Sequence, residues 1–406
     1  MANSFLKVLE NRDFKRMWFS QLFSQIALNM LTFGSVLHIF ELTGKATSIS
    51  LVMIASAIPV AIFGPFSGVL ADRVDYRKIL IYTNLLRVVA IIFLLYSTRN
   101  LLAIFEVIFI ISALSQIFSP AESAAIPLVV PKNQLVSANS AVMTTTFVTL
   151  LIGYCVAGAF LSLLGAFWLF AICGFLFIVA SWATFLLSNF DNKKTEKLTI
   201  TKFATGIEHV WREMKTGLHY VTDSKDILRP MIRLTIGWTI FGSLITILPA
   251  FSASILKIDP KLIAPLVVAP AGVGMFLATL SLNKKTTVNM GLMNMGFLLA
   301  GVAMFIVSFY PLYSHFFLAI VVLLILAVIF GYGTSLIQIP GQTLLHLNSE
   351  QDKRGRVFGM STMMLRLATT LPSVIVGGIS DLTSPLITMI LLGTITIIYA
   401  VILMFE

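Results

Sequence analysis

A dense group of charged residues lies between two long apolar stretches in the first part of the chain. The segment GVLADRVDYRKIL opens with Gly68 and holds Asp72, followed by Arg73, Arg77 and Lys78. A carboxylate in this position can accept hydrogen bonds from the free N–H groups at the start of a helix. The basic residues by themselves could serve only to orient the chain in a membrane. That explanation does not account for an acid beside a glycine, which lets helices approach closely, so the segment predicts a polar contact between helices.

An ionisable side chain inside an apolar stretch is a functional candidate by default. The candidates singled out are Arg87, Arg366, Glu106 and His38. Glu106 is interpreted as the only acid well inside a predicted span, so it is the leading candidate for carrying a proton. The alternative is a Glu106 side chain that reaches the outer headgroups. His38 is expected to be structural.

Side-chain amides recur at helical spacing in two apolar stretches. Such a stripe must face protein or water, because facing lipid would cost free energy. The first stripe comprises Gln21, Gln25, Asn29 and Thr32, and the second comprises Gln338 and Gln342. Contact with a substrate or water, and hydrogen bonding between helices, are both open for these residues.

The composition belongs to a membrane protein. Hydrophobic residues make up 58% of the chain and charged residues only 11%, whereas soluble domains carry about 25% charged residues. The net charge of +10 would suggest nucleic acid in a soluble protein, but its distribution here indicates membrane topology. No GxxxxGK[ST] segment, metal-ligand cluster or catalytic spacing is present, and Cys155 and Cys173 lie in apolar runs. We therefore expect no cofactor, no metal and no enzymatic activity.

The sequence predicts an all-α polytopic membrane protein with twelve transmembrane helices. The predicted spans are 17–40, 47–70, 79–97, 101–119, 138–162, 166–188, 231–256, 262–281, 288–309, 312–338, 357–379 and 385–404. Similar segments follow Pro120 and Pro340, which favours two pseudo-symmetric halves of six helices around a central cavity. The predicted domains are residues 1–188, a cytoplasmic linker over 189–230, and residues 231–406.

Lysine and arginine residues predict the orientation of these spans. Most of the 28 fall at the termini or in loops on one side, and the opposite side holds only Lys45, Arg99, Lys257 and Lys261. Both termini are therefore predicted to be cytoplasmic. In the linker, apolar residues recur at helical spacing from Phe203 to Val221. They predict an amphipathic helix that either lies on the membrane face or packs on the helix bundle.

The charged segment resembles the loop signature of the major facilitator superfamily. The matching residues are Gly68, Leu70, Asp72, Arg73, Arg77 and Leu80. Asp75 and Tyr76 depart from the signature, as they do in a bacterial branch that includes enterobactin-type siderophore exporters and macrolide efflux proteins. The segments NRDFKRMWFSQLFSQIA, FSPAESAAIPLVVPKNQLVSAN and RGRVFG are similar to that branch as well.

This resemblance implies a gate at the cytoplasmic face. Asp72 is expected to brace the start of the eleventh span, near Arg354 and Arg356, while the cavity opens outward. The contact must break when the cavity opens inward, which makes it a state-dependent charge pair. In such a fold the first and eleventh spans line the cavity. Gln25, Asn29, Gln338, Gln342 and Arg366 then become candidates for contacting the substrate, with gating as the alternative for Arg366.

In the same fold the third span is peripheral, so we expect Arg87 to pair with a neighbouring carbonyl or acid rather than to line the substrate path. The resemblance implies a monomeric secondary transporter in the bacterial inner membrane. Its expected function is proton-driven export of a small amphipathic compound, either drug-like or a siderophore. Alternatives on the same fold are a lysophospholipid flippase and a nutrient uptake symporter. A sensor or channel without alternating access is a rival of another class.

Overall fold

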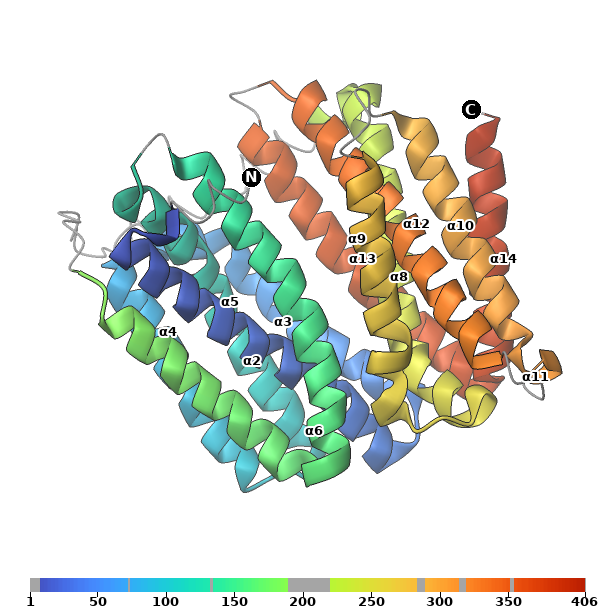
Figure 1. The fold of residues 1–406 in the computed structure, drawn as a ribbon, viewed down its shortest axis with the longest axis horizontal. Coiled ribbons are helices and arrows are strands. Elements are labelled where there is room, and N and C mark those ends of the chain that lie inside the picture. Colours follow the sequence, from blue (N-terminus) through green and yellow to red (C-terminus); the bar gives the residue numbers. More distant parts are fainter. Residues whose placement is uncertain are drawn as a thin grey trace. The chain divides into compact units, whose positions relative to one another are not determined.

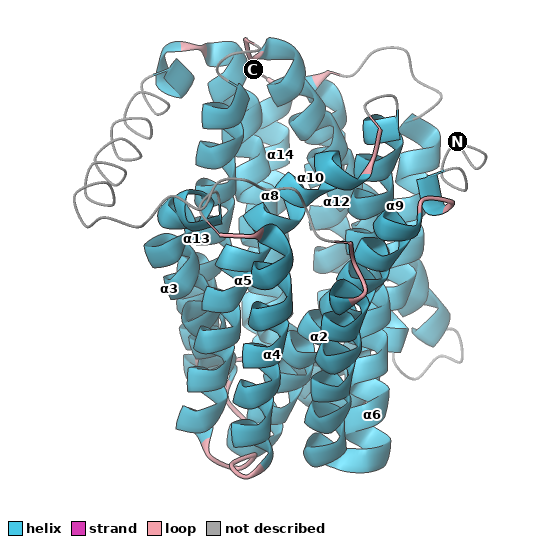
Figure 2. Ribbon diagram, turned by 90° about the vertical axis from the view of Figure 1, so that its left-hand side faces the viewer, coloured by secondary structure: helices cyan, strands magenta, loops and turns pink. Residues whose placement is uncertain are grey.

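The computed structural model describes residues 8–71, 74–131, 134–188, 220–282, 289–313, 319–350 and 354–405, and within these ranges it contains helices and no strand (Figure 2). The helices of the first part of the chain are α2 (Arg12–Thr43), α3 (Ala46–Ala71), α4 (Tyr76–Leu95), α5 (Leu101–Val129) and α6 (Leu135–Phe185). Those of the second part are α8 (Lys225–Phe251), α9 (Ala269–Leu282), α10 (Met290–Ser308), α11 (Tyr310–Tyr313), α12 (Ala319–Asn348), α13 (Arg354–Leu382) and α14 (Pro385–Met404). Figure 1 shows these helices coloured along the sequence.

Among the described residues, 10 helices are long and apolar enough to cross a membrane. The end of α13, Leu367–Leu382, forms a shorter apolar helix. Many large apolar side chains are exposed on these helices, such as Leu163, Trp182 and Ile375. They would be unfavourable in water and fit a surface that faces lipid. The prediction of an all-α polytopic membrane protein is therefore confirmed.

One of these elements, α6, is two helices joined at a sharp bend. Gly165 has φ 81° and ψ 175° inside the 51-residue element. Glycine adopts a positive φ readily because it lacks a Cβ atom. The bend falls between the predicted spans 138–162 and 166–188, so it accounts for two spans within one element.

Two helices extend beyond their predicted ends. We expected the fourth and tenth spans to stop before Pro120 and Pro340, but α5 continues to Val129 and α12 to Asn348. Proline is tolerated inside membrane helices because neighbouring groups can satisfy the freed carbonyls. The extension of α5 places Glu122 inside a helix, where it is buried.

The seventh span also begins earlier than predicted. Helix α8 starts at Lys225 instead of 231, and its Arg233 is buried. Most of the predicted linker, with its amphipathic helix, lies outside the described residues, so the linker and the boundaries at 188 and 231 stay predictions.

Contacts divide the described chain into two compact units. The first contains residues 8–38 and 55–188, and the second contains residues 39–54 and 220–405. In the first unit α4 packs against both α5 and α6, and in the second α10 packs against α12 and α14. The segment 39–54 thus packs with the second unit, although α2 and α3 both continue into the first.

Candidate functional site

A polar interior cluster of the first unit is built around Arg87 of α4. This side chain is only 1% exposed. Its Nη1 donates hydrogen bonds to Ser24 Oγ of α2 at 2.8 Å and to Asn84 Oδ1 at 2.9 Å. Its Nη2 donates to Ser115 Oγ of α5 at 3.0 Å. The guanidinium therefore ties together three helices of the unit.

Two aromatic rings complete the surroundings of the Arg87 guanidinium. Its Cζ lies 4.8 Å from the ring centre of Phe118 and 5.3 Å from that of Phe177. A cation over a ring face is attracted by the ring quadrupole, and the attraction grows when the site is dry. Phe177 belongs to α6, so a fourth helix joins the cluster. Arg87 Nε and Asn84 Nδ2 have no hydrogen-bond partner among the described residues.

Glu122 of α5 is an acidic residue near Arg87. Its side chain is 7% exposed, and it interacts electrostatically with Arg87. Arg87 is thus held by polar groups and a nearby acid. The alternative for Arg87, a place on the substrate path, stays a prediction.

Glu106 differs from Glu122 in its surroundings. Both lie on α5, but Glu106 is exposed and Glu122 is buried. The prediction that Glu106 is the only acid well inside a span was therefore wrong. Sequence reasoning missed Glu122 because Pro120, two residues before it, was interpreted as the end of the helix. The small apolar residues of AESAAIPLVV, which continue the hydropathy past Pro120, are the signal that could have revealed it.

The second unit contains a related arrangement around Arg233 of α8, which is 4% exposed. Arg233 Nη1 donates to Asn294 Oδ1 of α10 at 2.8 Å, and Asn294 Nδ2 donates to the Leu403 carbonyl of α14 at 2.6 Å. In both units a buried guanidinium is therefore held by an asparagine oxygen. The difference is that Arg87 lies near a buried carboxyl group.

Part of the predicted gate lies among the described residues. Asp75 caps α4, since its side chain accepts a hydrogen bond from Arg77 N at 2.9 Å. Arg77 Nη2 donates to the Phe185 carbonyl, and Lys78 is exposed. Gly68 lies on α3, and Arg354 and Arg356 lie on the first turn of α13, but the surroundings of these three residues are outside the described part. Asp72 and Arg73 themselves lie outside the described residues.

The predicted substrate residues are distributed over three helices. Gln25 and Asn29 of α2 are half-buried, and Asn29 packs closely against Gly153 of α6. Gln338 of α12 is half-buried and Gln342 is exposed. Arg366 lies on α13, and its side chain is outside the described part. Gln21 donates to the Val142 carbonyl at 3.3 Å, so this member of the α2 stripe bonds to a neighbouring helix.

His38, at the end of the first unit, has the structural surroundings that we expected for it. Its ring packs edge-on against Phe170, and Nε2 lies 2.9 Å from the Thr98 carbonyl. It is only 7% exposed.

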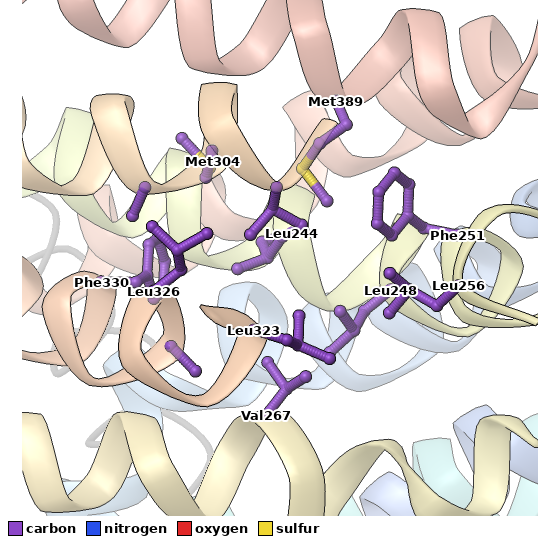
Figure 3. A pocket seen from close by; sticks show the side chains of 13 residues that line it. Leu244, Leu248, Phe251, Leu256, Val267, Met304, Leu323, Leu326, Phe330 and Met389 are labelled. Carbon is purple, nitrogen blue, oxygen red and sulfur yellow. The ribbon is translucent and has the colours of Figure 1, made fainter. Parts of the chain in front are cut away.

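An apolar pocket lies inside the second unit (Figure 3). Side chains of α8, α10, α12 and α14 line it, including Leu244, Phe251, Met304, Leu323 and Met389. In Figure 3 the drawn side chains carry only carbon and the two methionine sulfurs. Methionine side chains adapt to irregular shapes. The pocket can accept an apolar group but offers no hydrogen bond to fix its orientation.

The electrostatic interaction between Arg87 and Glu122 can be tested by a double-mutant cycle. Arg87→Met should destabilise the protein by about 3–5 kcal/mol, because it removes the hydrogen bonds to Ser24, Asn84 and Ser115 and the charge near the buried Glu122. The double variant Arg87→Met/Glu122→Gln should be more stable than Arg87→Met alone. Thermal unfolding in detergent, followed by tryptophan fluorescence, measures both effects. Strictly additive losses in the two single variants would show that the residues do not share a charge interaction.

The chain resembles known transporters over most of its length. Residues 17–371 match the family described as Major Facilitator Superfamily. The chain is 26% identical to "Uncharacterized MFS-type transporter YfiS" of Bacillus subtilis over 352 residues, which cover 83% of this chain and 78% of that protein. It is 33% identical to "Macrolide efflux protein A" of Streptococcus pyogenes over 126 residues, 30% of this chain and 31% of that protein.

Solved structures show the same fold at low sequence identity. A POT family transporter in complex with 5-aminolevulinic acid matches with a TM-score of 0.73 at 15% identity, over 97% of this chain and 96% of that chain. The nucleoside transporter NupG matches with a TM-score of 0.70 at 15% identity, over 95% of this chain and 98% of that chain. The match of residues 17–371 to the family and the membrane-spanning helices agree, and the chain belongs to the Major Facilitator Superfamily.

Proposed function

We propose that this transporter exports a small amphipathic compound and that proton entry drives the export. The observation that carries the proposal is the burial of Glu122 beside Arg87. Among the described residues, Glu122 is the one acidic residue whose side chain is buried. An ionisable group inside a membrane protein is expensive to keep and marks an ion pathway or a binding site. A carboxyl group that can hold or release a proton in this place is suited to proton coupling.

The protonation state of Glu122 would change the attraction acting on the Arg87 guanidinium. A charged carboxylate attracts Arg87, whereas a protonated carboxyl group does not. Arg87 is bonded to Ser24 on α2, and the next residue on α2 is Gln25, a candidate substrate residue. A shift of the guanidinium would therefore act on the helix that carries Gln25 and Asn29. This provides a short physical connection between the proton site and the candidate substrate site.

The substrate class is proposed from the chemistry of the candidate residues. Gln25, Asn29, Gln338 and Gln342 offer amide hydrogen bonds, and Arg366 offers a positive charge. The apolar pocket of the second unit can take an apolar group. A compound with both polar and apolar parts fits these features, and the partial similarity to a protein named for macrolide efflux supports a drug-like molecule.

Localisation and coupling follow from the same proposal. We place the protein in the bacterial inner membrane as a monomer with both termini in the cytoplasm, on the basis of the distribution of lysine and arginine. Export then carries the compound from the side of the termini to the opposite side, and protons move the other way. Glu106, exposed on α5, keeps the alternative role of a residue at the outer headgroups.

The test of the proposed function is a transport measurement in inverted membrane vesicles with a preset pH gradient. Macrolides, catecholate siderophores and lysolipids should be added one class at a time while the internal pH is recorded. We expect one class to collapse the gradient in vesicles that contain the protein and not in empty vesicles. If a compound binds the purified protein but moves no protons, proton-driven export is wrong. Facilitated lipid exchange would then favour the flippase, and proton-coupled transport in the other direction would favour uptake.

A further inference from the structure

The start of α3 is capped by a side chain from a distant helix. Asp381, in the last turn of α13, accepts hydrogen bonds from Ala46 N and from Thr47 N, each at 2.8 Å, one on each carboxylate oxygen. The Thr47 hydroxyl donates to the same carboxylate. The first N–H groups of a helix have no partner within the helix, and a capping side chain usually comes from the residue just before it.

The local sequence provides no such cap for α3. Helix α2 ends at Thr43, and Gly44 turns the chain with φ 65° before Lys45 and the first helical residue. A lysine side chain has donors and no acceptor, so Lys45 cannot take the free N–H groups. The start of α3 therefore depends on Asp381, which lies 335 residues away from Ala46 in the sequence.

From this cap, a strip of further contacts continues along α3 and α13. Ser50 Oγ of α3 donates to the Ser373 carbonyl of α13 at 2.8 Å, and both serines are fully buried. Gly377 of α13 lies directly against Ser50 and the Ala46 carbonyl. Ser373, Gly377 and Asp381 are spaced by four residues and so share one face of α13. Small residues on this face let the two backbones approach closely.

A second tie lies near the end of α2. Lys261 Nζ, in the short helix Pro260–Leu262 that precedes α9, pairs with Glu41 Oε1 at 2.9 Å. Both this pair and the strip involve residues of segment 39–54, which belongs to the second unit. The remainder of α2 and α3 belongs to the first unit. Any movement of one unit against the other must therefore bend these two helices or break the contacts of segment 39–54.

We propose that Ala46, Thr47 and Ser50 of α3 form a latch with Ser373, Gly377 and Asp381 of α13, and that Asp381 must release α3 for this end of the transporter to open. This proposal rests on the proposed transport function, which requires the two units to move. Asp381 is exposed, so water can replace its hydrogen bonds at little cost when the latch opens. In the closed state, the hydrogen bond between Ser50 and Ser373 and the close contact at Gly377 keep α3 and α13 aligned.

The latch complements the gate implied at the other end of α3. There Asp72, just after α3, is expected to brace the start of α13, where Arg354 begins the helix. At the latch, an acid at the end of α13 holds the start of α3. The latch and the predicted gate would then close in alternation. Under the predicted orientation, the latch lies at the outer end and closes while the cavity faces the cytoplasm.

The test is a distance measurement across the latch in the full-length protein in lipid nanodiscs. Cys155 and Cys173 are replaced by serine, and spin labels are attached at Lys45→Cys and Thr383→Cys, two exposed positions that flank the latch. Pulsed electron paramagnetic resonance should show short and long distances in exchange. Asp381→Asn should raise the ratio of long to short distances about fivefold, since a capping carboxylate is worth about that factor. The side chain of asparagine has one acceptor oxygen, so it cannot accept all three hydrogen bonds that Ala46 N, Thr47 N and the Thr47 hydroxyl donate to Asp381.

Ser384→Ala is the matched control, because Ser384 caps its own helix, α14, three residues after Asp381. It should leave the distance ratio unchanged. An unchanged ratio in Asp381→Asn, or an equal rise in Ser384→Ala, would overturn the latch. As a second measurement, a short reducible cross-linker between the two cysteines should stop transport of any compound that the protein moves, and reduction should restore it. Transport at the full rate after cross-linking would also overturn the latch.

The distance measurement requires neither a substrate nor a coupling ion. If Asp381→Asn shifts the distances while no compound moves protons, the latch is correct and proton-driven export is wrong. If protons move with a compound but the distances do not respond to Asp381→Asn, export is correct and the latch is wrong.

Discussion

Glu122→Gln should abolish proton-driven transport and leave the protein folded. Glutamine keeps the shape of the side chain and its ability to hydrogen-bond, but it cannot bind or release a proton near neutral pH. If Glu122 carries the coupling proton, the collapse of the pH gradient on adding substrate should fall to the level of empty vesicles. Binding of the substrate to purified protein should remain, because Glu122 lies in the polar cluster of Arg87 and is not among the candidate substrate residues.

Glu106→Gln is the control for this result. It removes the same charge from the same helix, α5, but at an exposed position. If Glu106 takes no part in coupling, proton-coupled transport should stay close to that of the wild type, and the exposed position should leave the stability nearly unchanged. Full transport in Glu122→Gln together with loss in Glu106→Gln would return the coupling role to Glu106. Size-exclusion profiles and thermal midpoints of both variants establish that the comparison concerns folded protein.

Gly331→Val should prevent stable folding of the second unit. At Gly331 of α12 an added Cβ atom would overlap the carbonyl oxygen of Ala271 on α9, and at Gly274 of α9 it would overlap that of Val328 on α12. Backbone atoms cannot rotate away as a side chain can, so valine must push the helices apart. Overpacking of a core costs about 1–3 kcal/mol, and separating two backbones in contact should exceed that range. The yield of monodisperse protein after extraction should fall at least tenfold.

Gly378→Val tests whether the effect comes from this close contact. Gly378 lies on α13, and a Cβ atom built there meets no atom within 4 Å. The substitution is the same and the residue is again helical, so the cost should be within about 1 kcal/mol. Equal losses of yield in Gly331→Val and Gly378→Val would mean that valine in a helix, and not the contact of α9 with α12, causes the defect.

Local sequence properties determined the membrane class and the approximate positions of the spans. Hydropathy is summed over about twenty neighbouring residues, so it needs no knowledge of what packs against them. The break of α6 at Gly165 falls between two predicted spans for the same reason. Span ends were less accurate at Pro120 and Pro340, because proline ends a helix in water but is tolerated where neighbouring helices satisfy the freed groups.

The candidate coupling site was predicted only in part. Arg87 was identified from its position inside an apolar run, and an acid was named among its expected partners. The acid itself was missed, because burial of Glu122 depends on the continuation of α5 past Pro120. The burial of Arg233 likewise depends on the packing of α8 against α10 and α14. The roles of the predicted gate and substrate residues remain predictions.

The sequence by itself determined that this chain is a helical membrane protein, where most of its spans lie, and which family signature its charged segment carries. Only the tertiary structure decided which polar groups meet: Arg87 with Ser24 and Ser115, and Asp381 with the start of α3. The physical reason is that hydropathy and motif spacing are properties of neighbouring residues. A hydrogen bond between residues 335 positions apart depends on how whole helices pack.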